Sequence, residues 1–336
     1  MYNTTMIQTI HFWFRNARNT SLPQSILPAI LAVSMAFKQP GFSWLYALLG
    51  VTGVIVGHLG VNLFDDYFDY RKKETGYRQQ MVREGMRARI AKCEYLTSGK
   101  ATLNQLLAAC IVFCAVALAI GLMIFFKRGN VIFYFMLITA GLGFFYSGPP
   151  LRLSYRGLGE LQTGLMFGPL LMSGVYYATC GKLDVSLYFI SVPIGLLVAN
   201  ILYTHSIMDY GPDCKVGKMT LAVLLKSKKA MLFVLALFLF ASYFLVFYGV
   251  FAHFLSSYYL LTALTLPMAV SLIYLMIQFV KDPYKKFSPR FWMGPMSNWE
   301  RMEKAGISWF MLRWYLARNL LSFLCLIIII VNCIVS

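Results

Sequence analysis

Residues 43–69 read SWLYALLGVTGVIVGHLGVNLFDDYFD, an apolar run that ends in three aspartates. A bilayer core needs about 20 consecutive apolar residues in helical form. The run over 43–64 therefore predicts a transmembrane helix, and the aspartates at its end predict a polar site at the membrane surface. The rest of the chain contains further apolar runs of this kind and one more acidic cluster.

The composition is that of a membrane protein. Of the 336 residues, 59% are hydrophobic and 13% are charged, and the mean hydropathy is +0.65. A soluble domain has about 25% charged residues, so a soluble fold is excluded. The chain contains no linker rich in Pro, Ser and Gly, and we therefore expect a single membrane-embedded domain over 1–336.

The apolar runs predict an all-α, multispan integral membrane helical bundle of about nine transmembrane helices. The expected spans are 22–37, 43–64, 104–126, 131–146, 158–179, 185–208, 230–250, 256–280 and 314–334.

Basic residues lie in the loops on one side of these spans. The formal net charge is +17, and 26 of the 30 Lys and Arg residues fall in alternate loops. Basic loops mark the cytoplasmic side. We therefore expect a multi-pass protein of the inner or plasma membrane with its N-terminus in the cytoplasm and its C-terminus outside. The lipid bilayer is the expected partner of this charge; nucleic acid is not, and the sequence indicates no protein partner.

Five of the 13 acidic residues form two clusters at the expected cytoplasmic ends of spans. Asp65, Asp66 and Asp69 follow the second span, and Asp209 and Asp213 follow the sixth. Spacings of three and four place carboxylates on one helical face, where they repel unless a cation lies between them. Helix capping or pairing with loop lysines would also explain either cluster alone.

Mg²⁺ is the cation that this pattern favours, because it takes one or two carboxylates together with waters and substrate phosphates. If the two clusters face each other, Mg²⁺ could hold a diphosphate between them. A prenyl tail would then run between the helices, where Phe and Tyr are plentiful. A site of His and Asp for another metal is the alternative, since His58 shares a helical face with Asn62, and His205 shares one with Asp209.

The clusters belong to a longer series of motifs that resembles the UbiA superfamily of intramembrane prenyltransferases, and within it the 1,4-dihydroxy-2-naphthoate polyprenyltransferases. The resemblance covers about 13–280. Its motifs are RNTSLP at 18–23, NLFDDYFD at 62–69, LTSGK at 96–100, YSGPP at 146–150, YRGLGE at 155–160, DYGPD at 209–213 and GKMTLAV at 217–223.

The resemblance implies Mg²⁺-dependent transfer of a prenyl group from a polyprenyl diphosphate to a small aromatic acceptor, at a site open to the cytoplasm. It implies that four aspartates are the catalytic ligands of Mg²⁺ and diphosphate. It also implies substrate contacts from six further residues. The four ligands are Asp66, Asp69, Asp209 and Asp213, and the contacts are Asn62, Asp65, Tyr146, Arg156, His205 and Lys218.

The chain departs from the family pattern at several of these positions. Asp65 and His205 stand where the family has Asn, Thr75 stands where it often has Asp, and Met208 stands where it commonly has Arg. Two other activities therefore stay open. One is a transporter or channel that uses the same aspartates for ions or protons, and the other is cyclisation of a prenyl diphosphate.

The segment 281–313 interleaves basic and aromatic residues between the last two spans. At a membrane face this pattern is typical of a helix that lies in the interface. Ser297 and Glu300 resemble a capping box, so we predict a cytoplasmic interfacial helix over 298–311. Single-stranded nucleic acid can also bind such a pattern, but the position between spans argues against it.

Overall fold

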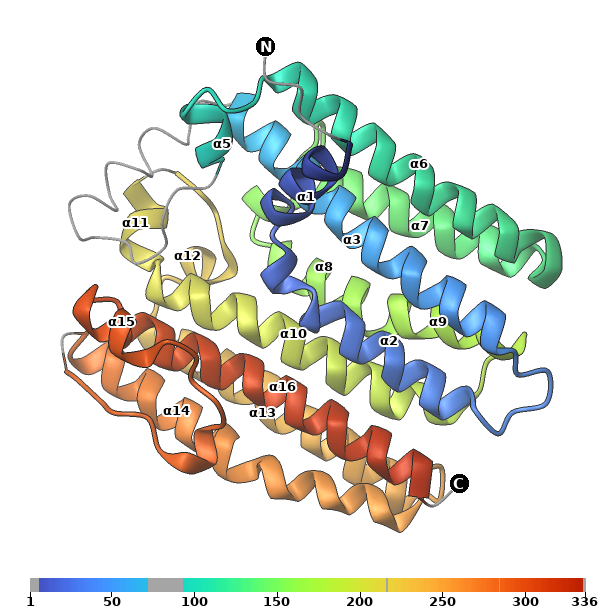
Figure 1. The fold of residues 1–336 in the computed structure, drawn as a ribbon. Helices are drawn as coiled ribbons and strands as arrows, with labels where there is room; N and C mark the ends of the chain where they lie inside the picture. Colours follow the sequence, from blue (N-terminus) through green and yellow to red (C-terminus); the bar gives the residue numbers. More distant parts are fainter. Residues whose placement is uncertain (1–5, 72–92, 216, 284, 335–336) are drawn as a thin grey trace.

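The computed structural model describes residues 6–71, 93–215, 217–283 and 285–334. Within these ranges every regular element is a helix, and the long helices form one bundle (Figure 1). Arg156 and Met219 form an isolated parallel bridge between two loops. The predicted all-α membrane bundle is confirmed. Thr75 lies outside the described residues.

In the described part of the chain, seven helices are long and apolar enough to cross a membrane. They are α3 (Trp44–Arg71), α6 (Leu103–Arg128), α7 (Asn130–Ser147), η4 with α10 (Val185–Met208), α13 (Lys228–Phe251), η5 with α14 (Ser257–Lys281) and α16 (Ser308–Ile334). The other two expected spans are also helical. One is α2 (Pro23–Ala36), with 14 residues. The other is divided among α8 (Gly159–Leu165), η3 (Met166–Leu170) and α9 (Leu171–Cys180). The count of nine spans therefore stays a prediction.

The break between α8 and α9 is a π-helical turn that contains Pro169. It lies where the helix comes very close to α10. A Cβ atom added at Gly168 would lie 2.4 Å from the Cα of Gly195, and one added at Gly164 would lie 2.7 Å from the carbonyl oxygen of Gly195. Small residues let membrane helices approach in this way, and π-turns are often found near functional sites.

The bundle is packed unevenly. Its largest hydrophobic core joins α2, α9, α10, α13, α14 and α16. Of the apolar stretch of α10, 61% of residues are buried, whereas the figure for α7 is 17%. The helices α3, α6 and α7 are therefore less enclosed by the rest of the bundle than α10 is.

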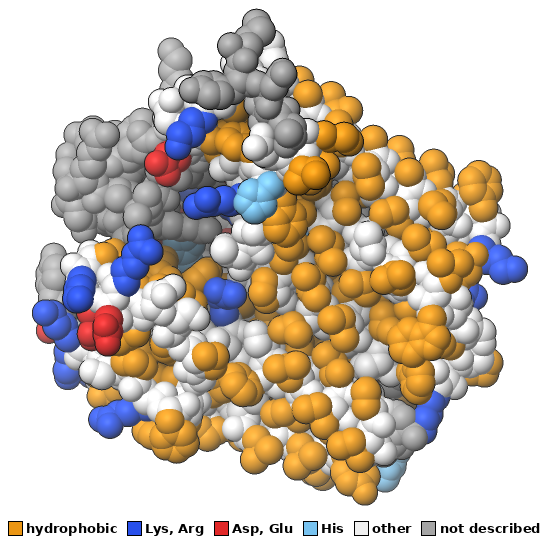
Figure 2. Space-filling model, in the orientation of Figure 1, with side chains coloured by type: hydrophobic (Ala, Val, Ile, Leu, Met, Phe, Trp, Pro, Cys, Tyr) orange, Lys and Arg blue, Asp and Glu red, His pale blue; other side chains and the backbone are white. Residues whose placement is uncertain are grey.

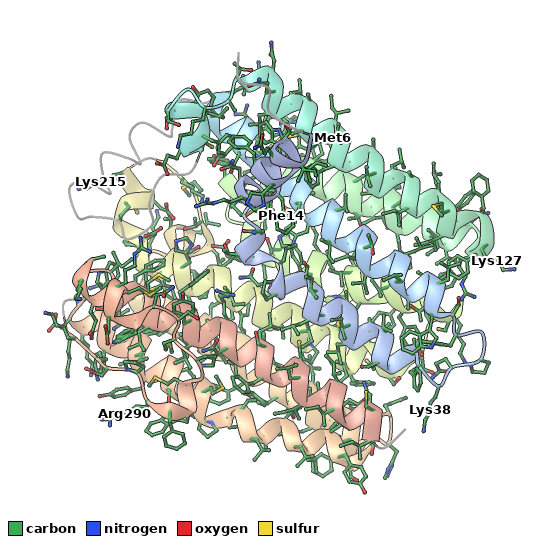
Figure 3. All side chains as sticks on the ribbon, in the orientation of Figure 1. Met6, Phe14, Lys38, Lys127, Lys215 and Arg290 are labelled. Atoms are coloured by element: carbon green, nitrogen blue, oxygen red, sulfur yellow. The ribbon has the colours of Figure 1, made fainter. Side chains whose placement is uncertain are left out.

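Charge separates towards the two ends of the helices. Figure 3 places Lys215 and Arg290 at one end of the bundle, and Lys38 and Lys127 at the other. Between them, hydrophobic side chains cover the face seen in Figure 2. Four short helices surround the first end: α1 (Met6–Asn16), α5 (Glu94–Thr97), α11 (Tyr210–Lys215) and α12 (Leu221–Leu225) (Figure 1). This end carries both acidic clusters.

The predicted helix over 298–311 is wrong. The structure has a six-residue helix, α15 (Trp299–Lys304), and then a turn at Gly306, whose φ of +71° ends the helix before α16 begins at Ser308. The predicted capping box is also wrong, because Asn298 occupies the cap position in the left-handed region without a side-chain cap.

The chain before α15 turns back along the bundle. Trp292 Nε1 donates to Ser271 Oγ at 3.0 Å, and Asn319 Nδ2 donates to the carbonyl oxygens of Met293 and Pro295 at 2.9 and 3.0 Å. Ser271 lies ten residues before the end of α14 at Lys281, about 15 Å along the helix axis. This stretch therefore lies against the middle of α14 and α16.

Candidate active site at the acidic end of the bundle

A cavity of about 770 Å³ opens beside α3, within the size range of small-molecule sites. Its polar end is formed by the aspartates of α3 and by residues of α10 and of the loop before α12. From Asp66 to Gly50, which also lines it, the cavity follows α3 for 16 residues, about 24 Å. The part of the cavity away from the aspartates is lined by glycines and apolar side chains: Gly53, Gly57, Ala117, Ile120, Gly121, Met136, Gly174 and Val175.

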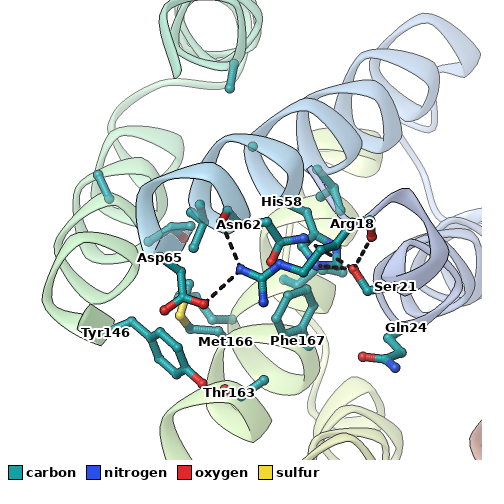
Figure 4. A pocket seen from close by; sticks show the side chains of 18 of the residues that line it. Arg18, Ser21, Gln24, His58, Asn62, Asp65, Tyr146, Thr163, Met166 and Phe167 are labelled. Carbon is teal, nitrogen blue, oxygen red and sulfur yellow. Dashed lines mark hydrogen bonds and ion pairs between the residues drawn. The ribbon is translucent and has the colours of Figure 1, made fainter. Parts of the chain in front are cut away.

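Arg18 holds the acidic end of α3 (Figure 4). Its Nη2 donates to the carbonyl oxygen of Asn62 at 2.8 Å and to Asp65 Oδ2 at 2.8 Å, and it lies 3.3 Å from Asp66 Oδ1. Arg18 has a left-handed backbone, with φ of +59°. A non-glycine residue rarely adopts this conformation, and here it turns the chain between α1 and α2 so that the guanidinium reaches α3.

Charge and burial act in opposite directions on Arg18. Burial lowers its pKa, but attraction to Asp66, Asp65 and Asp69 outweighs burial and raises the pKa above the ordinary value of arginine. The guanidinium therefore stays charged. It is a cation among carboxylates that are 9%, 2% and 3% exposed for Asp65, Asp66 and Asp69.

Hydroxyl groups bind the other carboxylate oxygens of this cluster. Tyr95 donates to Asp66 Oδ2 at 3.1 Å, Tyr155 donates to Asp69 Oδ1, and Ser147 donates to Asp65 Oδ1 at 2.5 Å. Burial and the charge of Asp66 raise the pKa of Tyr95 well above its usual range, so this hydroxyl stays a donor. The three aspartates thus have fixed orientations at the mouth of the cavity.

The acidic cluster after α10 is arranged differently. Asp209 and Asp213 are each 2% exposed. Asp209 Oδ2 lies 3.1 Å from Nε2 of His205, one turn earlier. The His205 ring packs edge-on against Phe310 of α16, with the centroids 5.0 Å apart. His205 and Ser206 line the cavity, and among the described residues Asp209 and Asp213 do not.

Glu160 joins α8, α10 and the loop that carries Lys218. Its Oε1 accepts from Ser206 Oγ at 2.6 Å and from the backbone N–H of Leu221 at 3.2 Å. The side chain is 3% exposed. Because Leu221 begins α12, these bonds fix the loop before it, and Lys218 and Thr220 of that loop line the cavity.

The structure brings most of the predicted site residues together. Seven of the ten line one cavity: Asn62, Asp65, Asp66, Asp69, Tyr146, His205 and Lys218. Asp209 and Asp213 are buried near it. Arg156 is exposed at the surface, and its Nη2 donates to the carbonyl oxygen of Pro150 at 3.3 Å. Arg156 is therefore placed beside the loop of Met219 and outside the cavity lining.

Sequence reasoning missed five residues that shape the site: Arg18, Tyr95, Ser147, Tyr155 and His58. Each of the first four lies in or next to a quoted motif, but no spacing rule relates those motifs to the aspartates of α3. The left-handed turn at Arg18 has no glycine to mark it. Sequence spacing relates His58 to Asn62 on one helical face, as a candidate for the alternative metal site, and not to the serines that contact it.

The donor set suits Mg²⁺ bound together with a phosphate. Among the described residues, no three His, Cys, Asp or Glu side chains form a ready-made metal cage. A transition-metal site needs such a cage, so the alternative of a His and Asp metal centre is not supported. Mg²⁺ needs fewer protein ligands, and takes one or two carboxylates with substrate phosphates and waters. Two or three fixed carboxylates beside a large cavity meet that requirement.

Comparison with known proteins identifies relatives along most of the chain. The model of the UbiA prenyltransferase family matches residues 25–297. A 1,4-dihydroxy-2-naphthoate octaprenyltransferase of Bacillus subtilis is 26% identical over 218 residues. The alignment covers 63% of this chain and 65% of that relative, so the chain spans a little under two thirds of its length.

Solved structures share the fold at low sequence identity. A digeranylgeranylglyceryl phosphate synthase has a TM-score of 0.62 at 16% identity, with 97% of this chain and 99% of that chain covered. A UbiA homologue of Archaeoglobus fulgidus, solved with GPP and Mg²⁺, has a TM-score of 0.55 at 17% identity, with 91% and 98% covered.

Proposed function

The chain belongs to the UbiA prenyltransferase family, and on this basis we propose that it transfers a prenyl group from a polyprenyl diphosphate to a small aromatic acceptor. The acceptor class is that of 1,4-dihydroxy-2-naphthoate, and diphosphate is the second product. One observation carries the proposal: a single cavity that follows α3 for about 24 Å has fixed carboxylates and basic groups at one end and apolar side chains at the other. An amphiphile with a charged head and a long apolar tail has that shape.

The head of the donor binds at the polar end. Asp66 and Asp69 of α3, with Asp209 and Asp213 of the cluster after α10, would hold Mg²⁺ and through it the diphosphate. When bound, Mg²⁺ neutralises the charge that develops on the leaving diphosphate. The homologue from Archaeoglobus fulgidus was solved with both GPP and Mg²⁺, which supports this ligand pair for a family member.

Two basic side chains of the protein stabilise the negative charge that develops on the leaving diphosphate. Arg18 lies beside Asp65 and Asp66, and Lys218 lines the cavity on the loop that Glu160 fixes. Both charges are present before the substrate arrives, so they stabilise developing negative charge without reorganisation. Asn62 turns its amide towards Ala17 and Ser21, and so keeps the Arg18 turn against α3.

The apolar channel receives the tail and excludes water from the reacting carbon. The C–O bond of the donor breaks with its electron pair on the diphosphate oxygen, and the prenyl carbon becomes an allylic cation. Aromatic faces stabilise a cation by about 0.5–2 kcal/mol each, and Tyr146 and Phe167 line this part of the cavity (Figure 4). A channel without bulk water protects the cation from hydrolysis.

The acceptor reaches the site from the basic end of the bundle, which we propose is cytoplasmic. The support for this orientation is the distribution of Lys and Arg, because 26 of these 30 residues fall in the sequence segments between spans that are expected on the cytoplasmic side. The N-terminus would then lie in the cytoplasm and the C-terminus outside. A naphthoate carries a negative charge, and Arg15 and Lys218 at the cavity mouth would attract it.

The test is an assay of purified protein with Mg²⁺ and a polyprenyl diphosphate against a panel of acceptors. We expect release of diphosphate that depends on both Mg²⁺ and the acceptor, and a product whose mass is that expected for the prenylated acceptor. A cyclase would release diphosphate without any acceptor. A transporter would release none, and either result would contradict the proposal.

A further inference from the structure

His58 is an ionisable side chain inside the membrane-spanning helix α3. It lies seven residues before Asp65, about 10 Å along the helix axis, and it lines the cavity. Its ring centroid is 4.8 Å from that of Phe167 at 63°. Ionisable groups at membrane depth are costly and usually functional, and the prenyl transfer described above gives His58 no part.

Two serines contact the two ring nitrogens, and Figure 4 shows one of them, Ser21, beside the ring of His58. Ser25 Oγ lies 2.7 Å from Nδ1, and Ser21 Oγ lies 3.3 Å from Nε2. The carbonyl oxygen of Leu22 accepts the hydroxyl proton of Ser25 at 3.0 Å, so Ser25 Oγ faces Nδ1 as an acceptor. The hydroxyl of Ser21 can donate to the carbonyl oxygen of Arg18, at 2.8 Å, or to Nε2.

A neutral imidazole has only one N–H to donate. The shorter contact takes it, so Nδ1–H donates to Ser25 and Nε2 keeps its lone pair. Ser25 does not line the cavity among the described residues, whereas Ser21 does. The basic nitrogen is therefore the one on the cavity side.

We propose that Nε2 of His58 is the base that takes the hydroxyl proton of the aromatic acceptor, an inference that rests on the proposed transfer reaction. A diphosphate bound at Asp66 and Asp69 places the reacting prenyl carbon deeper in the cavity than the phosphates, towards His58. An acceptor ring packed against Phe167, whose ring centroid is 4.8 Å from that of His58, would lie beside the imidazole.

The step balances in protons and electrons. The acceptor O–H bond breaks and its proton passes to Nε2, which forms an imidazolium. The electron pair of that bond moves into the ring, and the ring carbon forms a bond to the prenyl carbon as the C–O bond of the donor breaks. The diphosphate leaves with that electron pair. The ring carbon then loses the proton it carries to solvent, and the imidazolium returns its proton to the acceptor oxygen, which restores the aromatic hydroxyl.

The test compares wild type with His58→Gln on phenolic acceptors of graded O–H acidity. Glutamine can still donate to Ser25 but cannot accept the proton. A positioned base contributes about 10²–10⁴-fold, so we expect the variant to lose about 100-fold in kcat with the least acidic acceptor. The ratio of wild type to variant should fall towards one as acceptor acidity rises. The donor KM should not change.

The matched control is His253→Gln, at an exposed histidine in the loop after α13, which should behave as wild type. Ser25→Ala is a second variant that keeps the imidazole and frees Nδ1, and it should show the same trend with a smaller loss. A loss that is equal for all acceptors in both variants would mean that His58 only joins α2 to α3, and the assignment would be wrong. A wild-type protein that prenylates none of the acceptors would instead overturn the proposed function, and this assignment with it.

Discussion

The acidic end of α3 and the acidic end of α10 carry the same carboxylates, but their neighbours differ. At α3 a guanidinium and three hydroxyls fix the aspartates at the cavity surface. At α10 the neighbour of Asp209 is the imidazole of His205, and the aspartates lie behind the cavity lining. The carboxylates at the end of α3 therefore face the cavity in fixed orientations that suit a metal and a phosphate, whereas those at the end of α10 are set back from it.

The largest effect is expected at Asp66. In Asp66→Asn the carboxylate beside Arg18 and Tyr95 loses its charge, and we expect the rate of diphosphate release to fall by about 10²–10³-fold, the scale of removing one preorganised electrostatic group. The protein should still insert and fold. The same change at Asp209 should cost less, because that carboxylate lies behind the cavity lining.

Asp282→Asn is the control for this pair, since Asp282 is exposed after α14 and should leave turnover unchanged. Rates of diphosphate release at saturating Mg²⁺ would rank the three variants. An equal loss at Asp66 and Asp209 would remove the distinction between the two ends, and full activity in Asp66→Asn would remove the site.

The next effect is on stability, at Arg18. Arg18→Gln removes a cation from among three buried carboxylates, and charged hydrogen bonds of this kind contribute about 1–3 kcal/mol. We expect a lower melting temperature in detergent than for wild type. Because Mg²⁺ can supply positive charge at the same carboxylates, added Mg²⁺ should narrow the difference. The control Arg301→Gln, at an exposed residue, should have the melting temperature of wild type with and without Mg²⁺. If Arg18→Gln also had that melting temperature, Arg18 would not stabilise the aspartates of α3.

A smaller effect is expected at Lys218, the basic residue that lines the cavity from the side of α12. Met208 stands where the family commonly has arginine, so the end of α10 depends on another cation. Lys218→Gln should raise the donor KM about tenfold, equivalent to about 1.4 kcal/mol, with a smaller change in kcat. Lys215→Gln, at an exposed residue in α11, is its matched control. Identical steady-state kinetics in the two variants would show that Lys218 does not contact the donor.

The smallest effect is expected at His205. In His205→Asn the side chain loses the ring nitrogen that lies 3.1 Å from Asp209 Oδ2 and cannot carry a charge, but it stays polar, and asparagine is the residue common in the family. We expect a loss of about threefold in kcat/KM, at the lower end of the roughly 0.5–1.5 kcal/mol that a neutral polar contact contributes. His205→Phe, which removes the polar group and keeps a ring against Phe310, should lose more. If both variants kept full kcat/KM, the pair with Asp209 would have no role in turnover.

The sequence could predict the helical bundle because hydropathy alone specifies membrane helices. The expected spans agree with the helices of the described chain, and the bounds differ by a few residues. The sequence could not predict the division of the span over 158–179, because a π-turn at Pro169 and the approach of Gly168 to Gly195 are tertiary features. The helix expected over 298–311 failed because Gly306 adopts a positive φ there.

The site could be predicted as far as its residues lie on one helical face. Asn62, Asp66 and Asp69 have helical spacing, and they line the cavity together. The partners of these residues come from other elements, so no spacing reveals them. Arg18 reaches α3 across 47 positions of sequence, and Tyr155 reaches it across 86. Arg156 has a charge suited to the role assigned to it, but its loop directs it away from the cavity lining.

The most direct test of the account is a structure of the protein with Mn²⁺ and an unreactive prenyl thiodiphosphate, with the metal located by anomalous scattering. The account predicts metal about 2 Å from carboxylate oxygens of Asp66 or Asp69, a diphosphate that also reaches Asp209 or Asp213, and the tail along α3. Metal bound elsewhere, or the two acidic ends too far apart for one diphosphate and its metal ions to bridge, would contradict it.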